Sequence, residues 1–304
     1  MGAAMGHEIS MPIFQAFPDL AGSAGHTLLA TLPTPLEIHR GSDLGLSVRH
    51  MMIKRDDKSG RAYGGNKVRK LEFLLGEALR VGAHGVVTFG VAGSNHALAT
   101  SIYARACGLE SHSMLTRQSN AAYVRRNLLA GFHAGAHLHP CASEEQAVEH
   151  ADILIREARQ RGRTVVTIPG GGSSPLGCLG FVNAGLELAE QLRRESLPVP
   201  DLIYLPLGTV GTAAGLLLGI RLAGLSSRMV AVRVVRSDIA RPERFRRLTE
   251  ATGQLLDSPA SLEGELPEIR HEFLGPGYGR FTPEGVAAME TARRSLGLTL
   301  EGTY

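Results

Sequence analysis

The sequence contains no tryptophan, only three cysteines and only four lysines among its 304 residues. Three widely spaced cysteines without a CxxC pair argue against a disulfide framework and are typical of reduced thiols. No basic segment followed by an apolar one precedes the first helix, so we expect no secretory signal and a cytoplasmic protein. The net charge of +3 is too small to support binding to nucleic acid.

The small number of lysines leaves only four candidate side chains for an amine nucleophile. Lys54, Lys58, Lys67 and Lys70 all fall within one short segment, and the other 28 basic residues are arginines. Lys67 follows the glycine pair 64–65 at the start of an amphipathic helical pattern. A helix dipole disfavours bases in the first turn, so we prefer a functional interpretation of this cluster to a merely solvated helix start.

The pattern of the chain is an alternation of strands and helices. Apolar strands are predicted near 84–90, 111–116, 165–168, 202–207 and 230–235, with helical segments between them. Such alternation predicts an α/β fold with parallel sheets covered by helices, in which ligands bind at the carboxyl ends of strands. The apolar uncharged run between Asp201 and Arg221 is broken by Pro206 and by glycines that include Gly208, Gly211 and Gly215, so no membrane span is expected.

Three glycine-rich turns follow predicted strands, at 90–96, 169–174 and 208–212. The third opens a helix and adds two threonine hydroxyls, and the backbone N–H groups and dipole of a helix start favour an anion such as phosphate. Neither the dinucleotide fingerprint GxGxxG nor a Walker P-loop is present. The alternative interpretation is three ordinary strand-to-helix turns.

Two further patterns are a histidine and cysteine alternation and a cluster of arginines. His137, His139 and Cys141 alternate, so a strand would place them on one face as metal ligands, but Pro140 is expected to interrupt that strand and no fourth ligand is evident. We therefore predict no metal site. The arginines between 241 and 247 are interpreted as a solvated helix face.

Several motifs in order resemble one family. The string GGNKVRKLEFLLGEAL, then SNH, PGGGSSPLGCLGFV, GTVGT, PGYGRFTPEG and finally LEGTY span most of the chain. They resemble the D-cysteine desulfhydrase and 1-aminocyclopropane-1-carboxylate deaminase family, which comprises pyridoxal-phosphate (PLP) enzymes of fold type II, related to the tryptophan synthase β subunit. The resemblance implies PLP as cofactor, a small amino acid as substrate and a homodimer, without nucleic acid or membrane partners.

The resemblance also implies roles at matching positions. Lys67 matches the lysine that binds PLP covalently, and Asn95 matches the residue that hydrogen-bonds the 3′-oxygen of PLP. Ser94 matches a serine beside the substrate, and Tyr278 and Tyr304 match two active-site tyrosines. The resulting expectation is catalysis by Lys67, Ser94, Tyr278 and Tyr304, cofactor binding by Lys67, Asn66, Asn95, Gly208, Thr209, Val210, Gly211 and Thr212, and substrate binding by Ser94, Asn95, His96 and Ser173.

The implied activity is α,β-elimination of the D-cysteine desulfhydrase type, giving a 2-oxo acid, ammonia and sulfide. The alternatives are a 1-aminocyclopropane-1-carboxylate deaminase, an L-cysteate-type sulfo-lyase and a degenerate PLP-binding relative. His96 after Asn95 favours a desulfhydrase over a deaminase, and the tryptophan often found in the deaminases is absent. Gly93 departs from the family, which usually has glutamine there.

The resemblance finally implies two domains. Residues 1–67 and 179–304 would form a larger PLP-binding domain, and residues 68–178 a smaller inserted α/β domain. Family members continue past the position of Tyr304, so the C-terminal end is expected to be truncated by a few dozen residues that help to close the cofactor pocket.

Overall fold

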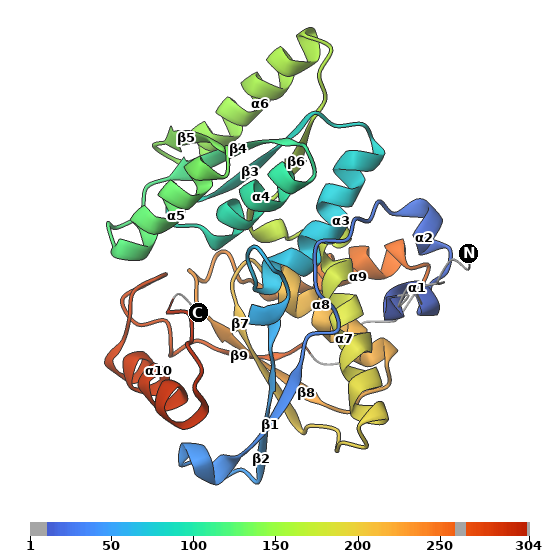
Figure 1. Cartoon of the computed structure of the whole chain (residues 1–304), viewed down its shortest axis with the longest axis vertical. Coiled ribbons are helices and arrows are strands. Elements are labelled where there is room, and N and C mark those ends of the chain that lie inside the picture. Colours follow the sequence, from blue (N-terminus) through green and yellow to red (C-terminus); the bar gives the residue numbers. More distant parts are fainter. Residues whose placement is uncertain (1–10, 259–265, 303–304) are drawn as a thin grey trace, which may run out of the picture.

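The computed structural model describes residues 11–258 and 266–302 of the chain. Tyr304, one of the two expected active-site tyrosines, lies outside the described residues. Two parallel sheets carry helices on their faces, and a separate two-stranded antiparallel sheet completes the architecture (Figure 1). The fold is therefore the α/β class with parallel sheets that the alternation of elements predicts.

The first sheet has four parallel strands in the order β5-β4-β3-β6. Its strands are β3 (Gly85–Val91), β4 (Glu110–Thr116), β5 (His137–Cys141) and β6 (Val165–Ile168), and it is contacted by α4 (Asn95–Ala106), α5 (Ala122–His133) and α6 (Glu144–Gln160). The first four residues of β3 are all buried, as expected for an inner strand covered on both faces.

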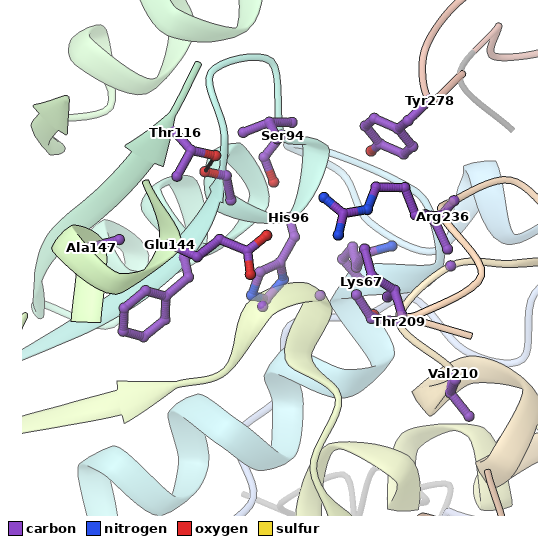
Figure 2. A pocket seen from close by; sticks show the side chains of 18 of the residues that line it. Lys67, Ser94, His96, Thr116, Glu144, Ala147, Thr209, Val210, Arg236 and Tyr278 are labelled. Carbon is purple, nitrogen blue, oxygen red and sulfur yellow. Dashed lines mark hydrogen bonds between the residues drawn. The ribbon is translucent and has the colours of Figure 1, made fainter. Parts of the chain in front are cut away.

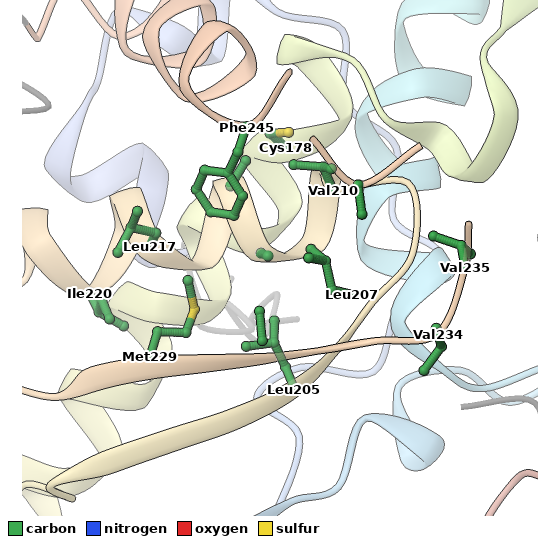
Figure 3. Close-up of a cluster of buried hydrophobic side chains, with 14 residues drawn as sticks. Cys178, Leu205, Leu207, Val210, Leu217, Ile220, Met229, Val234, Val235 and Phe245 are labelled. Carbon is green, nitrogen blue, oxygen red and sulfur yellow. The ribbon is translucent and has the colours of Figure 1, made fainter. Parts of the chain in front are cut away.

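The second sheet has three parallel strands in the order β7-β8-β9. Its strands are β7 (Leu202–Leu207), β8 (Arg228–Arg233) and β9 (Glu268–Arg270), and the helices of this part are α7 (Pro175–Arg194), α8 (Gly211–Leu222), α9 (Pro242–Leu255) and α10 (Pro283–Leu296). Figure 3 shows Leu207, Val210 and Phe245 packed in one apolar cluster beneath this sheet's helices. The cluster anchors the turn after β7, because Val210 within that turn is only 2% exposed.

The N-terminal part supplies short helices, the antiparallel pair and the helix that joins both sheets. It contains α1 (Pro12–Ala16), α2 (Leu20–Ser23), β1 (Leu36–Arg40), β2 (His50–Lys54) and α3 (Asn66–Arg80), with single 3₁₀ turns η1 (Gly41–Leu44), η2 (Asp56–Lys58) and, later in the chain, η3 (Gly170–Gly172). Helix α3 packs on both α4 and α7. Its apolar residues Val68, Leu71 and Leu75 are fully buried, and each contributes about 1.5–3 kcal/mol of hydrophobic stabilisation.

The expectation that Pro140 interrupts a strand is wrong. Strand β5 runs through Pro140 and pairs in parallel with β4. β5 lies at the edge of the sheet, where a proline that lacks an N–H is tolerated. Within the described residues, no group of three or more histidine, cysteine, aspartate or glutamate side chains has an arrangement that could hold a metal ion.

None of the helices in the described ranges combines the length and apolar character needed to cross a membrane.

Candidate active site

A cavity of about 630 Å³ opens where the carboxyl ends of the two parallel sheets face each other. It is lined by the start of α3, the turns after β3 and β4, the start of α6, the glycine turn at 170–171 and the segments after β7 and β8. Figure 2 shows the side chains that it contains, with Lys67 and Thr209 near one end and Glu144 and Ala147 near the other. This placement is the one expected for ligand sites in α/β folds.

Two lysines, Lys67 and Lys70, lie buried in the wall of this cavity. Lys67 is 8% exposed and its Nζ donates to Asn66 Oδ1 at 2.8 Å. Burial lowers the pKa of Lys67 to about 8, and the negative charge of Glu301 partly opposes this shift. An amine with a pKa near 8 has a substantial neutral fraction at physiological pH, which a nucleophile requires.

Lys70 lies one turn further along α3. Its Nζ donates to the backbone oxygen of Gly171 at 3.1 Å, and burial together with the charge of Lys67 lowers its pKa to about 7. No carboxylate in the described part of the chain forms an ion pair with this ammonium group. A buried cation beside a glycine turn is suited to a doubly charged phosphate, which would restore the charged form of Lys70.

The turn after β7 carries the features of a phosphate site. Thr209 and Ser173 share a hydrogen bond between their hydroxyls at 2.7 Å, and Gly211 N donates to Ser173 Oγ at 3.2 Å. Asn66 Nδ2 donates to Thr212 Oγ1 at 3.0 Å, which ties the start of α3 to the start of α8. The first turn of α8 thus has its N–H groups and two threonine hydroxyls at the cavity, where an anion is favoured.

The backbone of this turn is strained at Val210. Its φ of 75° and ψ of −34° lie outside the regions that a β-branched residue adopts readily. Strain of this kind is concentrated at ligand-binding sites and is maintained by the surrounding packing. Here that packing is the apolar cluster of Figure 3, in which the Val210 side chain is buried.

The residues at this end of the cavity fit PLP. PLP bound here would have the buried amine of Lys67 for its aldehyde, and the N–H groups and hydroxyls of the turn at 208–212, together with Lys70, for its phosphate. Gly171 leaves no room for a side chain, because a Cβ there would lie 2.1 Å from Thr209 Oγ1. The glycine therefore keeps the threonine hydroxyl close to the cavity.

Asn95 begins α4, between the lining residues Ser94 and His96, and takes part in a hydrogen-bonded network. Its Oδ1 accepts from Asn127 Nδ2 at 2.8 Å and from Tyr63 Oη at 3.1 Å, and its Nδ2 donates to Glu301 Oε1 at 3.2 Å. Because its oxygen already accepts twice, the amide is oriented with its NH₂ group as the remaining donor. Asn127 Nδ2 also donates to the backbone oxygen of Gly93 at 2.9 Å.

At Gly93, where the resembling family usually has glutamine, neighbouring side chains fill the space. A Cβ at this position would lie 2.9 Å from Gln118 Oε1 and 2.9 Å from a ring carbon of Tyr123, so the space for a side chain is filled. Gln118 Oε1 accepts from Gly93 N at 2.7 Å. A glutamine from the end of β4 thus reaches the place next to Ser94 where the family usually has one in sequence.

Ser94 and His96 line the cavity on either side of Asn95. Ser94 caps α4 by accepting from Ala97 N at 3.2 Å. His96 is 3% exposed and forms a hydrogen bond of 3.0 Å with Thr88 Oγ1. Burial lowers the pKa of His96 well below its usual value, and the charges of Lys67 and Lys70 act in the same direction, so the imidazole is neutral.

The structure brings most of the expected residues to one cavity. Its lining includes Asn66, Lys67, Ser94, His96, Gly208, Thr209, Val210, Thr212 and Tyr278. Asn95, Ser173 and Gly211 are not among the lining residues. Ser173 shares a hydrogen bond with Thr209, which lines the cavity, and Asn95 and Gly211 each stand in sequence between two lining residues. Sequence reasoning missed Lys70, Gln118 and Asn127, of which only Lys70 had a signal, as one of four lysines.

Comparison with known proteins shows the family of the chain. The family model for pyridoxal-phosphate dependent enzymes matches residues 27–303, and the chain belongs to this family. It is 36% identical over 265 residues to nocardicin C-9′ epimerase from Nocardia uniformis subsp. tsuyamanensis, which covers 86% of this chain and 80% of the relative. It is 35% identical over 294 residues to D-cysteine desulfhydrase from Serratia proteamaculans (strain 568), covering 94% and 84%.

A solved structure shows the same fold. The crystal structure of an ACC (1-aminocyclopropane-1-carboxylate) deaminase homologue is 29% identical and superposes with a TM-score of 0.82, covering 96% of this chain and 86% of that one. The expected fold class and the expected cofactor, PLP, are therefore confirmed.

Proposed function

We propose that this protein catalyses a PLP-dependent α,β-elimination of the D-cysteine desulfhydrase type, which converts a small amino acid into a 2-oxo acid and ammonia, with sulfide as leaving group. The observation that carries the proposal is the buried Lys67 amine, with its pKa near 8, beside the phosphate-binding turn at 208–212. The 35% identical desulfhydrase supports it.

In this proposal, PLP supplies an electron sink for the negative charge that develops at the substrate α-carbon. Lys67 moves the proton at that carbon, and Asn66 Oδ1 orients its Nζ through the 2.8 Å hydrogen bond. Ser94 and the first N–H groups of α4 bind the substrate carboxylate, since a helix start favours an anion. Tyr278, which lines the cavity, transfers a proton to the leaving group.

Asn95 is proposed to donate its Nδ2 to the 3′-oxygen of PLP, with the amide held by Asn127 and Tyr63. Tyr304 is proposed as the second active-site tyrosine, and Ser173 and His96 as residues that shape the substrate site. The neutral His96 acts as a hydrogen-bonding wall rather than as a cation.

The test is a spectrum followed by an assay. The purified protein with added PLP should show a visible absorption band, which Lys67→Ala should abolish and Lys58→Ala should retain. Lys58 is the matched control because it is 49% exposed, pairs with Glu37 and does not line the cavity. The variants that keep the band should release sulfide and pyruvate from D-cysteine, and Lys67→Ala should not. A protein that stays colourless with PLP contradicts the proposal.

A second candidate is epimerisation at the α-carbon, which also begins with removal of the α-proton. It is favoured by the relative named nocardicin C-9′ epimerase, at 36% identity. A panel of D- and L-cysteine, L-cysteate, serine and 1-aminocyclopropane-1-carboxylate separates the alternatives. Keto acid release indicates elimination or deamination, whereas exchange of the α-hydrogen in D₂O with inversion and no keto acid indicates epimerisation.

We also propose the division into a larger domain of residues 1–67 and 179–304 and a smaller one of residues 68–178. It is supported by the four-stranded sheet, whose strands all lie within the smaller segment. Assembly into a homodimer is proposed from the family resemblance, and sedimentation velocity would measure it.

A further inference from the structure

The cavity extends well beyond the end that fits PLP. We call the extension the distal chamber, and it lies on the side of Glu144 and Ala147 in Figure 2. Its walls come from the ends of β3 and β4, the start of α6, the segment after β8 and the start of α9, namely Phe89, Met114, Arg117, Glu144, Ala147, Val148, Ile239 and Arg244. Arg236 extends toward it from the side of Lys67 and Tyr278 (Figure 2). A cavity of about 630 Å³ has room for more than PLP and a substrate as small as cysteine.

The inner walls of the distal chamber are apolar. Met114 and Ala147 are buried in the cluster that also contains Phe89, beneath the four-stranded sheet. Val148 and Ile239 add aliphatic surface. Such walls suit the methylene groups of an extended side chain, because apolar surface is then removed from water.

Charged side chains stand around this apolar surface. Three arginines, Arg117, Arg236 and Arg244, face one carboxylate in the cavity, that of Glu144. Figure 2 shows Arg236 and Glu144 extending from opposite sides toward the space next to His96. The hydrogen bond from Arg236 to Asp238, and to a smaller extent the charge of Glu144, raise the pKa of Arg236.

The ion pair between Arg236 and Asp238 leaves the guanidinium accessible. Arg236 is 76% exposed and Asp238 39% exposed, and ion pairs that water surrounds contribute little to stability. A guanidinium fork binds a carboxylate through two parallel hydrogen bonds, which is a stronger and more specific contact.

We propose that the distal chamber binds the far end of an extended substrate side chain, and that this end carries an anion such as a carboxylate or a sulfonate. The inference rests on the proposed function and narrows its substrate class. In the elimination, the α-proton passes to Lys67 and the Cβ–S bond breaks with its electron pair on sulfur. Tyr278 then protonates the sulfur, so the leaving group is a thiol that still carries the anion in the distal chamber.

The test measures binding to the PLP-loaded protein with amino acids that have no β-leaving group. 2-Aminoadipate, norleucine and lysine have side chains of similar length that end in an anion, a methyl group and a cation. Titration calorimetry with both enantiomers should show roughly 10-fold tighter binding of 2-aminoadipate than of norleucine, with lysine weakest.

Three variants test which side chains cause the preference for 2-aminoadipate. Arg236→Gln should abolish most of the preference for 2-aminoadipate while it leaves norleucine binding unchanged, and Glu144→Gln should increase the preference. Arg247→Gln is the matched control, because Arg247 is exposed on the same helix as Arg244 but does not line the cavity. Circular dichroism would confirm that these exposed substitutions leave the fold intact.

The outcomes separate this inference from the proposed function. If D-cysteine is converted to sulfide and pyruvate but the three amino acids bind equally, or lysine binds best, the inference is wrong and the proposed function stands. If the protein shows no PLP band and releases no keto acid, the proposed function fails as well.

Discussion

Substituting methionine for Arg69 should strongly destabilise the protein and weaken PLP binding. Arg69 is fully buried on α3, two residues after Lys67. Its guanidinium donates to both carboxylate oxygens of Glu187, at 2.9 and 3.0 Å, and to Asp56 at 2.8–3.1 Å. It also donates to Thr34 Oγ1 at 2.9 Å, so one side chain ties the start of α3 to α7 and to the N-terminal segment.

The magnitude follows from what remains after the substitution. Methionine retains most of the aliphatic stem, but Glu187, at 3% exposure, is left with Lys54 as its one cationic partner among the described residues. Removing one partner of a buried ion pair costs about 3–5 kcal/mol of unfolding free energy. At roughly 2–4 °C per kcal/mol for a chain of this size, the melting temperature should fall by about 6–20 °C.

The substitution should also change how the stability of the fold depends on pH. Burial raises the pKa of Glu187, but hydrogen bonds and charges of Arg69 and Lys54 outweigh this effect and hold the pKa below its usual value. A depressed carboxyl pKa stabilises the fold above the pKa of the unfolded chain, and this stability is lost as the pH falls. In Arg69→Met the Glu187 pKa should rise, so acid unfolding should begin at a higher pH.

Urea unfolding followed by far-UV circular dichroism is the appropriate assay, since the chain has no tryptophan for fluorescence. Arg80→Met is the matched control on the same helix, because Arg80 is 54% exposed and pairs only with Glu77 in the same turn. Its loss should leave the unfolding free energy nearly unchanged, because water screens an exposed ion pair. Equal destabilisation by the two substitutions would refute the reasoning.

Three further predictions concern the site and the four-stranded sheet. Asn127→Asp places a carboxylate against Asn95 Oδ1, so PLP should dissociate roughly 10-fold more readily and the visible band should shift, whereas the exposed Asn120→Asp should do neither. Val210→Gly should be more stable in urea than Val210→Ala, by about 0.5–1 kcal/mol, because only glycine relieves the positive φ; the opposite order would show that the turn is unstrained. Burial and the charges of His137 and His139 lower the pKa of His112 to about 4, so the wild-type protein should lose stability as the pH falls from about 6.5 to 4, and His112→Asn should flatten that dependence in thermal melts.

Much of the site could be predicted because its chemistry is local in the sequence. Lys67 was recognisable from the scarcity of lysines and from its place after Gly64 and Gly65. The turn at 208–212 was recognisable as a proposed phosphate site because a helix start with glycines and hydroxyls favours an anion. In both cases a few consecutive residues carry the whole signal.

Other features could not be predicted because they depend on contacts between distant segments. Gln118 occupies the space beside Gly93 from the end of another strand, and Asn127 orients Asn95 across 32 residues. The continuity of β5 through Pro140 depended on the position of that strand at the edge of the sheet.

The sequence by itself determined the α/β class and the PLP family and singled out Lys67 as the proposed reactive amine, because periodicity, composition and short motifs are legible without contacts between distant segments. Only the tertiary structure decided the environment of that amine. Burial between the two sheets lowers the pKa of Lys67, the second lysine comes to face Gly171, and arginines from three separate segments gather at the distal chamber. These properties arise from desolvation and from charges brought together in space, which no local stretch of sequence encodes.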